Sequence, residues 1–160
     1  RRRMKIKLIF VGKTDEKHVK DICSFYFNKI THYIKIEIIE ISALKQTKNL
    51  SVKEQKQKET ALILKYIQLS DKVILLDEKG KTYTSVQFSN FIQTQMNTSL
   101  KQLVFVIGGA YGFSDEMYQR ADSLLSLSKM TLTHQMVRIV FLEQVYRAFT
   151  ILNNEPYHHC

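Results

Sequence analysis

The sequence predicts one α/β domain in which a mainly parallel sheet is flanked by helices. Short runs of β-prone residues recur along the chain, and helical patterns separate them. Such an alternation is typical of parallel strands joined by right-handed crossovers. The 160 residues suffice for a single core, and 44% of them are hydrophobic with only one proline. A compact globular protein is therefore expected.

The first third of the chain predicts a strand, a helix and a second strand. Residues 4–11 form an apolar run that Gly12 ends. Apolar residues then recur at helical spacing over 19–30. Apolar and charged residues alternate over 34–38, as in a strand with one polar face. The polar stretch 42–50 that follows is the best candidate for a mobile loop.

The remaining elements begin with a helix at Ser51, where Glu54 three residues later completes a capping-box pattern. Three further strands are predicted at 72–77, 102–107 and 124–128. A helix over 86–96 lies between the first two, and Ser114 is the expected N-cap of a shorter helix after the second. A last helix begins near His134. Its apolar face, which can pack on a sheet or on another subunit, comprises Met136, Ile139, Val140, Val145, Tyr146 and Phe149.

The charge and hydropathy of the chain indicate which classes of partner and which cellular location to expect. The formal net charge is +9, and three arginines ahead of Met4 contribute three of these charges, which leaves +6. We interpret residues 1–3 as a cloning remnant or a basic arm ahead of a single domain over 4–160. The positive excess favours RNA, although an acidic membrane or plain solubility would suit the same charge. No signal peptide and no apolar run of about 20 residues occurs, so a cytoplasmic protein without a membrane partner is expected.

Three loops follow the carboxyl ends of predicted parallel strands, where ligands bind in open α/β sheets. The first contains Gly80, the second is the glycine-rich stretch 108–112 and the third is 128–133. A glycine pair lets a ligand approach the main chain closely, although a tight turn is the plainer interpretation. No dinucleotide fingerprint follows the first strand, and motifs for hydrolysis or phosphoryl transfer are missing. We expect the three loops to line one pocket.

The last helix carries two charged pairs at a spacing of four. His134 and Arg138 share one face at the helix start, which would suit an anion or RNA. From spacing alone, a capping histidine and a surface arginine are the better interpretation. Glu143 and Arg147 are spaced in the stabilising order, and we predict a salt bridge between them.

The C-terminal tail places an aromatic ring, two imidazoles and a thiol close together, at Tyr157, His158, His159 and Cys160. Adjacent histidines seldom ligate one zinc, and no Cys or His pair lies upstream, so no metal is expected. A tail that reaches a base or a phosphate is the better functional interpretation, although most termini are simply disordered. Cys23 lies on the apolar side of a helix, so a disulfide is not expected.

Four stretches of the sequence together resemble a known family. They are MKIKLIFVGK from Met4, then VILLDEKGK, then LVFVIGGAYG, and most specifically LSLSKMTLTHQMVRIVFLEQVYRAFTILNNEPY over 125–157. The chain resembles the ribosomal RNA large-subunit methyltransferase H family, within the SPOUT class of knotted methyltransferases. This resemblance covers nearly the whole chain and implies a SPOUT α/β fold with a deep C-terminal trefoil knot. It also implies that S-adenosylmethionine binds in the knot.

The resemblance assigns residues by position. It implies a cofactor site at Leu76, Gly108, Gly109, Leu127, Ser128, Lys129, Met130, Thr131 and Leu132. Placement of the RNA or removal of a proton falls to His134, Arg138, Tyr157 and His158, without a decision on which is the base. The implied reaction is attack of the N3 of a pseudouridine in 23S ribosomal RNA on the sulfonium methyl group, without metal and on the assembled ribosome.

The resemblance further implies an obligate homodimer in which the partner's surface and tail complete each active site. Two positions depart from the family pattern. Thr133 stands in place of a proline, which would loosen the loop beside the cofactor. His159 stands in place of arginine or lysine, which would weaken a phosphate contact at neutral pH. Two alternatives stay open: a non-catalytic factor that binds RNA or the ribosome, and a SPOUT methyltransferase acting on another nucleotide.

Overall fold

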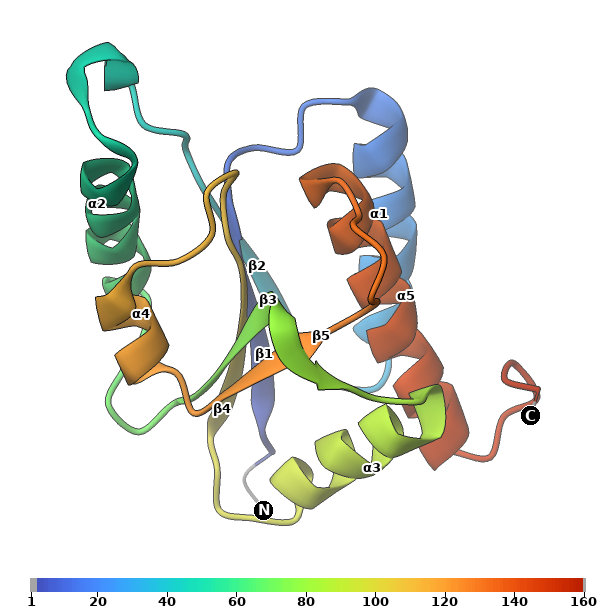
Figure 1. Ribbon diagram of the computed structural model, residues 1–160. Helices are drawn as coiled ribbons and strands as arrows, with labels where there is room; N and C mark the ends of the chain where they lie inside the picture. The colour runs from blue at the N-terminus through green and yellow to red at the C-terminus, as the bar shows by residue number, and fades with distance from the viewer. Residues whose placement is uncertain (1–2, 160) are drawn as a thin grey trace.

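The computed structural model describes residues 3–159, and it confirms an α/β fold built on one parallel sheet (Figure 1). The five strands are β1 (Lys5–Val11), β2 (Ile36–Ile41), β3 (Lys72–Thr82), β4 (Gln102–Ile107) and β5 (Ser123–Ser126). They lie in the order β2-β1-β4-β3-β5, and every neighbouring pair is parallel. The carboxyl ends of the strands therefore meet at one edge of the sheet.

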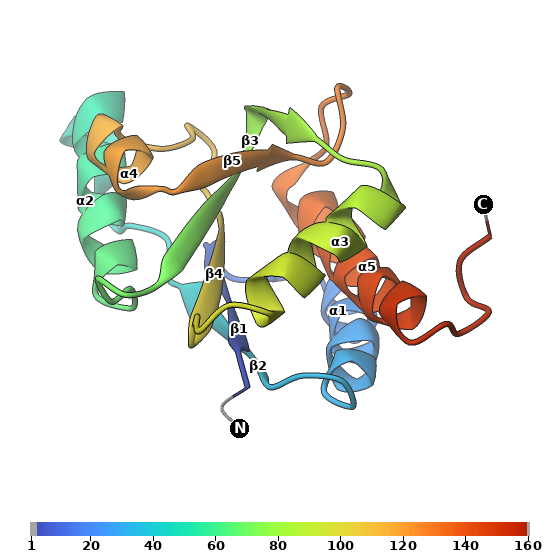
Figure 2. The same ribbon diagram turned by 90° about the horizontal axis from the view of Figure 1, so that it is seen from below.

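Helices cover both faces of the sheet and supply the crossovers that parallel strands require (Figures 1 and 2). One face is covered by α1 (Lys17–Ile30), α3 (Ser85–Met96) and α5 (His134–Leu152). The opposite face is covered by α2 (Val52–Leu64) and α4 (Asp115–Arg120). The result is a three-layer arrangement with the sheet in the middle.

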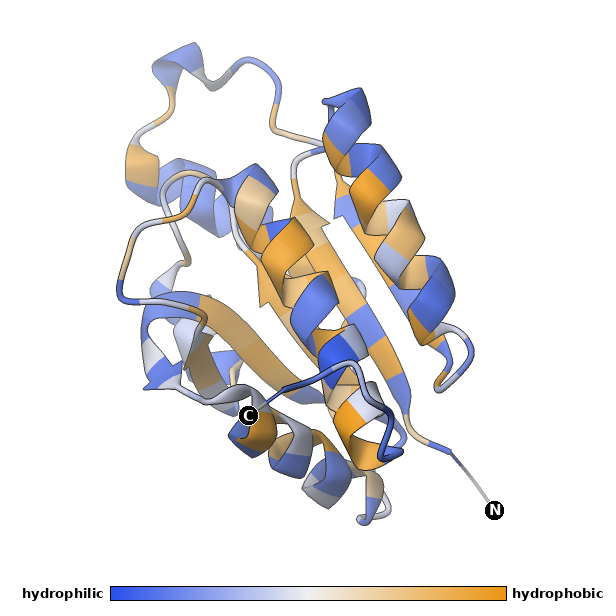
Figure 3. Ribbon diagram, turned by 90° about the vertical axis from the view of Figure 1, so that its right-hand side faces the viewer, coloured by the Kyte–Doolittle hydropathy of each residue, from blue (hydrophilic) through white to orange (hydrophobic). Residues whose placement is uncertain are grey.

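Two hydrophobic cores form because the sheet is buried on both sides. In β1, Ile6 and Leu8 belong to the core under α1 and α5, whereas Ile9 and Val11 belong to the core under α2 and α4. Each large apolar side chain that is fully buried contributes about 1.5–3 kcal/mol. Figure 3 shows hydrophobic strands behind helices of mixed character. Burial on both faces explains the continuous apolar runs in the sequence.

The last helix, α5, is the central helix of its layer. The ring centroid of Phe141 lies 4.8 Å from that of Phe105 in β4. Burial of Val145 and Phe149 confirms most of the predicted apolar face, but Met136 at its start is exposed. The first turn of α5 therefore extends past the packed core toward solvent.

The predicted helix starts are confirmed by their caps. Ser51 and Glu54 form both hydrogen bonds of a capping box at α2. The Ser114 hydroxyl accepts from the Met117 amide at α4. The Thr133 hydroxyl caps α5 in the same way, and the helix begins at His134 as predicted.

Three strands differ from the prediction by two residues or more, and one of them is β5, which covers Ser123–Ser126 rather than 124–128. The second strand covers Ile36–Ile41 rather than 34–38, because α1 is followed by a turn that ends only at residue 34. The third strand continues to Thr82 instead of ending at Asp77. An irregularity between Leu76 and Lys81 interrupts it, after which the chain pairs with β5 again.

Arg1, Arg2 and Cys160 lie outside the described residues, so the N-terminal extension stays a prediction. Cys23 is buried with a free thiol. Within residues 3–159, no helix is both long and apolar enough to cross a membrane. The polar stretch between β2 and α2 contains one short 3-10 helix, η1 (Thr47–Asn49).

Candidate functional site

A cavity of about 670 Å³ lies at the carboxyl edge of the sheet. Three segments line it, one within β3 and two in the loops after β4 and β5. Lys56 of α2 and His134 of α5 complete its walls. Its volume is that of a small-molecule site, and its position is the usual one in parallel sheets. The predicted pocket is confirmed for the loops after β4 and β5, whereas its third wall is formed by residues 76–79 within β3, and Gly80 does not line it.

The cavity brings together all nine residues that the family resemblance assigns to a cofactor. They are Leu76, Gly108, Gly109, Leu127, Ser128, Lys129, Met130, Thr131 and Leu132. Short-range hydrogen bonds shape the loop after β5. The Ser126 hydroxyl donates to the Ser128 carbonyl, and the Ser128 hydroxyl accepts from the Met130 amide at 2.9 Å. The role of these residues in binding stays a prediction.

Two of the three glycines in the loop after β4 are closely approached by side chains. A Cβ atom at Gly108 would lie 2.9 Å from the ring of Phe113, and one at Gly109 would lie 3.1 Å from both carboxylate oxygens of Glu59. The loop closes through a hydrogen bond from the Gly112 amide to the Gly109 carbonyl. A tight turn and a pocket wall are thus the same structure, so the two interpretations of the glycine pair do not exclude each other.

A carboxylate and a phenol form the polar wall of the cavity. The Tyr118 hydroxyl donates to Asp77, whose other oxygen accepts from the Lys79 amide at 2.8 Å. Burial and the Asp77 carboxylate together raise the pKa of Tyr118 to about 12. Asp77 is the last residue of the predicted strand 72–77, so its position could have identified it. Tyr118 and Lys56 carried no such signal, because only tertiary packing brings α4 and α2 to this edge.

Glu59 lies behind the glycine pair on α2. Its carboxylate forms no ion pair within residues 3–159. Desolvation by burial raises its pKa. Burial therefore makes the ionised form of this carboxylate less stable. A side chain at Gly109 would come into close contact with it.

Replacing Glu59 with glutamine is expected to raise the free energy of unfolding at neutral pH. Because the pKa of Glu59 is higher in the folded protein, the folded state loses stability relative to the unfolded chain as the carboxyl group ionises. The advantage of the variant should therefore shrink as the pH falls and both proteins become neutral at this position. Urea denaturation across the acidic range measures it. A variant that is less stable at neutral pH would mean that the loop stabilises the charged form.

Comparison with known proteins shows the family to which this chain belongs. A family model described as a predicted SPOUT methyltransferase matches residues 4–158. The chain belongs to the SPOUT methyltransferase family. Relatives named ribosomal RNA large subunit methyltransferase H are 59% identical in Christiangramia forsetii, 54% in Parabacteroides distasonis and 53% in Flavobacterium psychrophilum. Each comparison covers 98% of this chain and 99% of the relative, and the resemblance inferred from the sequence is confirmed.

In this SPOUT methyltransferase, His134 and Arg138 lie in different environments. His134 is exposed and lines the cavity, whereas Arg138 has an exposure of 0%. The Arg138 guanidinium donates to the hydroxyl of Thr14 at 2.7 Å and to the carbonyls of Val11 and Gly12 at 3.0 and 2.9 Å. The interpretation of Arg138 as a surface arginine is therefore wrong. The first turn of α5 overhangs the cavity, but the next turn packs on the end of β1.

The tail of this SPOUT methyltransferase lies along α5, away from the cavity. The Tyr157 hydroxyl donates to Glu143 at 2.9 Å, and Arg147 contacts the His158 Nδ1 at 3.1 Å. Arg147 and Glu143 form the predicted salt bridge at 2.8 Å. Burial and the Glu143 contact raise the pKa of Tyr157. Neither Tyr157 nor His158 lines the cavity, and the 14 residues from His134 to Arg147 span about 20 Å of helix.

Two further sequence predictions concern the family departures and metals. Thr133 replaces the proline that the family pattern suggests, and its hydroxyl accepts from the Met136 amide at 3.2 Å, which fixes the start of α5. Within residues 3–159, no group of three His, Cys, Asp or Glu side chains is placed to hold a metal ion. His159 is exposed, and its effect on phosphate binding stays a prediction.

Proposed function

We propose that this protein transfers the methyl group of S-adenosylmethionine to the N3 of a pseudouridine in 23S ribosomal RNA. Family membership and the shared name of the relatives support methyl transfer to large-subunit ribosomal RNA. The observation that carries the proposal is the cavity, because all nine residues assigned to the cofactor line it. We further propose a cytoplasmic enzyme that acts on the assembled ribosome and folds as one domain over 4–160.

The cavity suits the cofactor in size and in the character of its walls. The glycine pair and the loop after β5 offer main-chain donors and acceptors, and Leu76, Leu127 and Leu132 offer apolar surface. When bound, S-adenosylmethionine supplies an electrophilic methyl group on a positively charged sulfur. We propose that the segment from β5 into α5 is threaded as a deep trefoil knot, which the family membership and the meeting of three segments at the cavity support.

Positioning is the main contribution that we assign to the protein's own residues. Holding two reactants in line can by itself account for about 7–11 kcal/mol of a barrier. His134 overhangs the cavity on the exposed turn of α5. An imidazole there can orient the target base or take and relay the imide proton. Arg138 contributes indirectly in this proposal, because it fixes α5 against the end of β1.

A homodimer is proposed because the tail residues do not reach the cavity of their own chain. Tyr157 and His158 lie near the far end of α5. The neighbouring surface of α1 and α5 exposes large apolar side chains, including Phe25 at 55% and Met136 at 45%. Covering such a surface with a second copy would exclude water and bring the partner's tail toward the cavity.

Mixing two inactive variants tests whether the site is shared between subunits. One variant carries His134→Ala and the other Tyr157→Ala, and each is expected to be nearly inactive alone. In a mixed dimer, one site combines an intact cavity with an intact tail, so activity should return after joint refolding. Each variant refolded alone is the control. No recovery in dimers shown to be mixed would place both residues in the site of a single chain.

Labelled methyl transfer tests the reaction itself. The substrate is intact ribosomes from a strain that lacks this activity, and the large-subunit RNA is then analysed as nucleosides. Label in 3-methylpseudouridine is the expected result. Label in another nucleoside would favour a SPOUT methyltransferase with a different target. No label, together with no cofactor binding in calorimetry, would favour the non-catalytic binding factor.

A further inference from the structure

A lysine-rich segment leads from β2 into α2 and ends at the cavity. It comprises residues 42–56 and is called the lysine arm below, after Lys45, Lys48, Lys53 and Lys56. The first three lysines are exposed, and Lys56 lines the cavity. The segment has one acidic residue, Glu54, whose carboxylate is engaged in the capping box of α2. Its positive charge is therefore not neutralised from within.

The ammonium groups of the lysine arm form no ion pairs in the part of the chain that the structure describes. A few lysines elsewhere contact the protein itself. Lys7 pairs with Glu37 and donates to a main-chain carbonyl, and Lys29 lies over an aromatic ring 4.8 Å away. Exposed lysines such as Lys5, Lys35 and Lys101 also have no ion pair among the described residues, so what distinguishes the arm is its continuity with the cavity wall through Lys56.

The helical end of the arm is fixed in position relative to the cavity. Figure 1 shows the segment before α2 standing out beyond the carboxyl edge of the sheet. The hydroxyls of Thr60 and Ser114 are hydrogen-bonded, which fastens α2 to the start of α4. Lys53, Lys56 and Thr60 follow at spacings of three and four, so they share one face of α2. Because Thr60 faces α4 and Lys56 lines the cavity, Lys53 continues a basic stripe outward from it.

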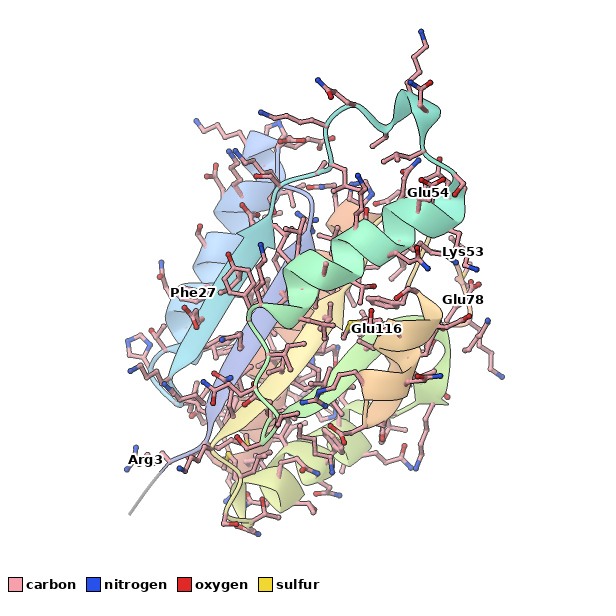
Figure 4. The ribbon with its side chains drawn as sticks, turned by 90° about the vertical axis from the view of Figure 1, so that its left-hand side faces the viewer. Arg3, Phe27, Lys53, Glu54, Glu78 and Glu116 are labelled. Atoms are coloured by element: carbon pink, nitrogen blue, oxygen red, sulfur yellow. The ribbon has the colours of Figure 1, made fainter. Side chains whose placement is uncertain are left out.

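Figure 4 agrees with this placement. It draws Lys53 on the side of the molecule that also carries Glu78, a residue of the cavity wall. The stripe therefore runs from the cavity wall toward the segment before α2, which extends beyond the sheet and carries Lys45 and Lys48. Lys56 lies in the cavity wall, and the three exposed ammonium groups belong to the segment that precedes it in the chain.

We propose that the lysine arm is the docking surface for the phosphodiester backbone of the RNA strand whose nucleotide enters the cavity. This inference rests on the proposed function. Ammonium groups on flexible stems suit phosphates spaced along a strand, and such contacts position a nucleic acid without reading its sequence. An anionic membrane would satisfy the same charges, but it would not explain why the stripe begins inside a cavity built for a small molecule.

The test is a triple variant in which Lys45, Lys48 and Lys53 become alanine. A matched control replaces Lys5, Lys35 and Lys101, which are exposed at the amino ends of strands on the opposite edge of the sheet. Both variants remove three charges, so general effects of net charge cancel. Methyl transfer to ribosomes is measured at several salt concentrations, and cofactor affinity is measured by calorimetry.

The arm variant is expected to raise KM for ribosomes at least about tenfold, with a smaller change in kcat and unchanged cofactor affinity. Each lost phosphate contact should make the negative slope of log affinity against log salt shallower by about 0.7–0.9. The three substitutions together should therefore reduce the magnitude of this slope by about two. The control variant should change KM less than twofold. Equal effects of the two variants, or an unchanged salt slope, would overturn the proposal.

Failure of this proposal can be told apart from failure of the proposed function. If the unmodified protein methylates no ribosome, direct binding of both variants to large ribosomal subunits replaces the kinetic test. The arm variant alone should then bind more weakly. Binding to phosphatidylserine vesicles is measured in parallel. Loss of vesicle binding with unchanged ribosome binding would assign the arm to a membrane and overturn the RNA proposal.

Discussion

Arg138→Ala is expected to lower the free energy of unfolding by about 3–5 kcal/mol, the usual cost of removing one member of a buried charged network. Its guanidinium holds the Thr14 hydroxyl and the carbonyls of Val11 and Gly12. It also lies 3.8 Å from Glu40. Removing it takes the guanidinium donor from the buried Val11 carbonyl and the partly buried Gly12 carbonyl, and leaves Glu40 without its cation. Urea denaturation at neutral pH gives the difference.

Two control variants separate the loss of positive charge from the loss of the planar set of hydrogen-bond donors. Arg138→Lys keeps a positive charge but cannot reproduce the planar set of donors, so an intermediate loss is expected. Lys20→Ala changes an exposed charge on the neighbouring α1 and should stay within about 0.5 kcal/mol. A loss below about 1 kcal/mol for Arg138→Ala would show that the surrounding groups find other partners.

The sequence predicted the elements whose signals are local. The capping residues Ser51 and Ser114 were identified correctly because a helix start depends on side chains within one turn. Buried parallel strands were recognisable from their apolar runs. The cavity was predictable for the same reason, because strand ends in a parallel sheet meet at one edge.

The environments of His134 and Arg138 could not be predicted from their spacing. Both residues lie on one side of α5, but the helix crosses the edge of the sheet between them. A spacing rule gives the direction of a side chain around the helix axis and contains nothing about what lies one turn further on. Tyr118 and Glu59 were not identified for a related reason, since tertiary packing alone brings Tyr118 to the cavity and Glu59 to the back of the glycine pair.

The extension of β3 to Thr82 was missed because it depends on a close contact between two main chains. The charged stretch after Asp77 looks like a loop. Gly80 has no side chain, so the strand can approach β5 and resume its pairing there. This contact has a measurable consequence, because β5 leads directly into the loop that lines the cavity.

Gly80→Ala is expected to destabilise the protein and to weaken cofactor binding together. A Cβ at this position would lie 2.6 Å from the main-chain nitrogen of Leu125 and 2.7 Å from two neighbouring main-chain carbons. Main-chain atoms of a paired strand cannot rotate away, so β5 must shift. Overpacking of this kind typically costs about 1–3 kcal/mol. The shift should pass into 126–132, and affinity for S-adenosylmethionine should fall at least about tenfold.

Gly112→Ala is the matched control, because it adds the same methyl group at a glycine where the new Cβ would not contact β5. Nothing lies within 4 Å of a Cβ at Gly112, but its φ of +80° is unfavourable for alanine. The control should therefore lose about 1–2 kcal/mol from backbone strain while β5 stays in place. Denaturation and cofactor calorimetry on both variants distinguish a shift of β5 from local backbone strain. If Gly80→Ala lost stability but bound the cofactor normally, the loop after β5 would be independent of the β3–β5 contact.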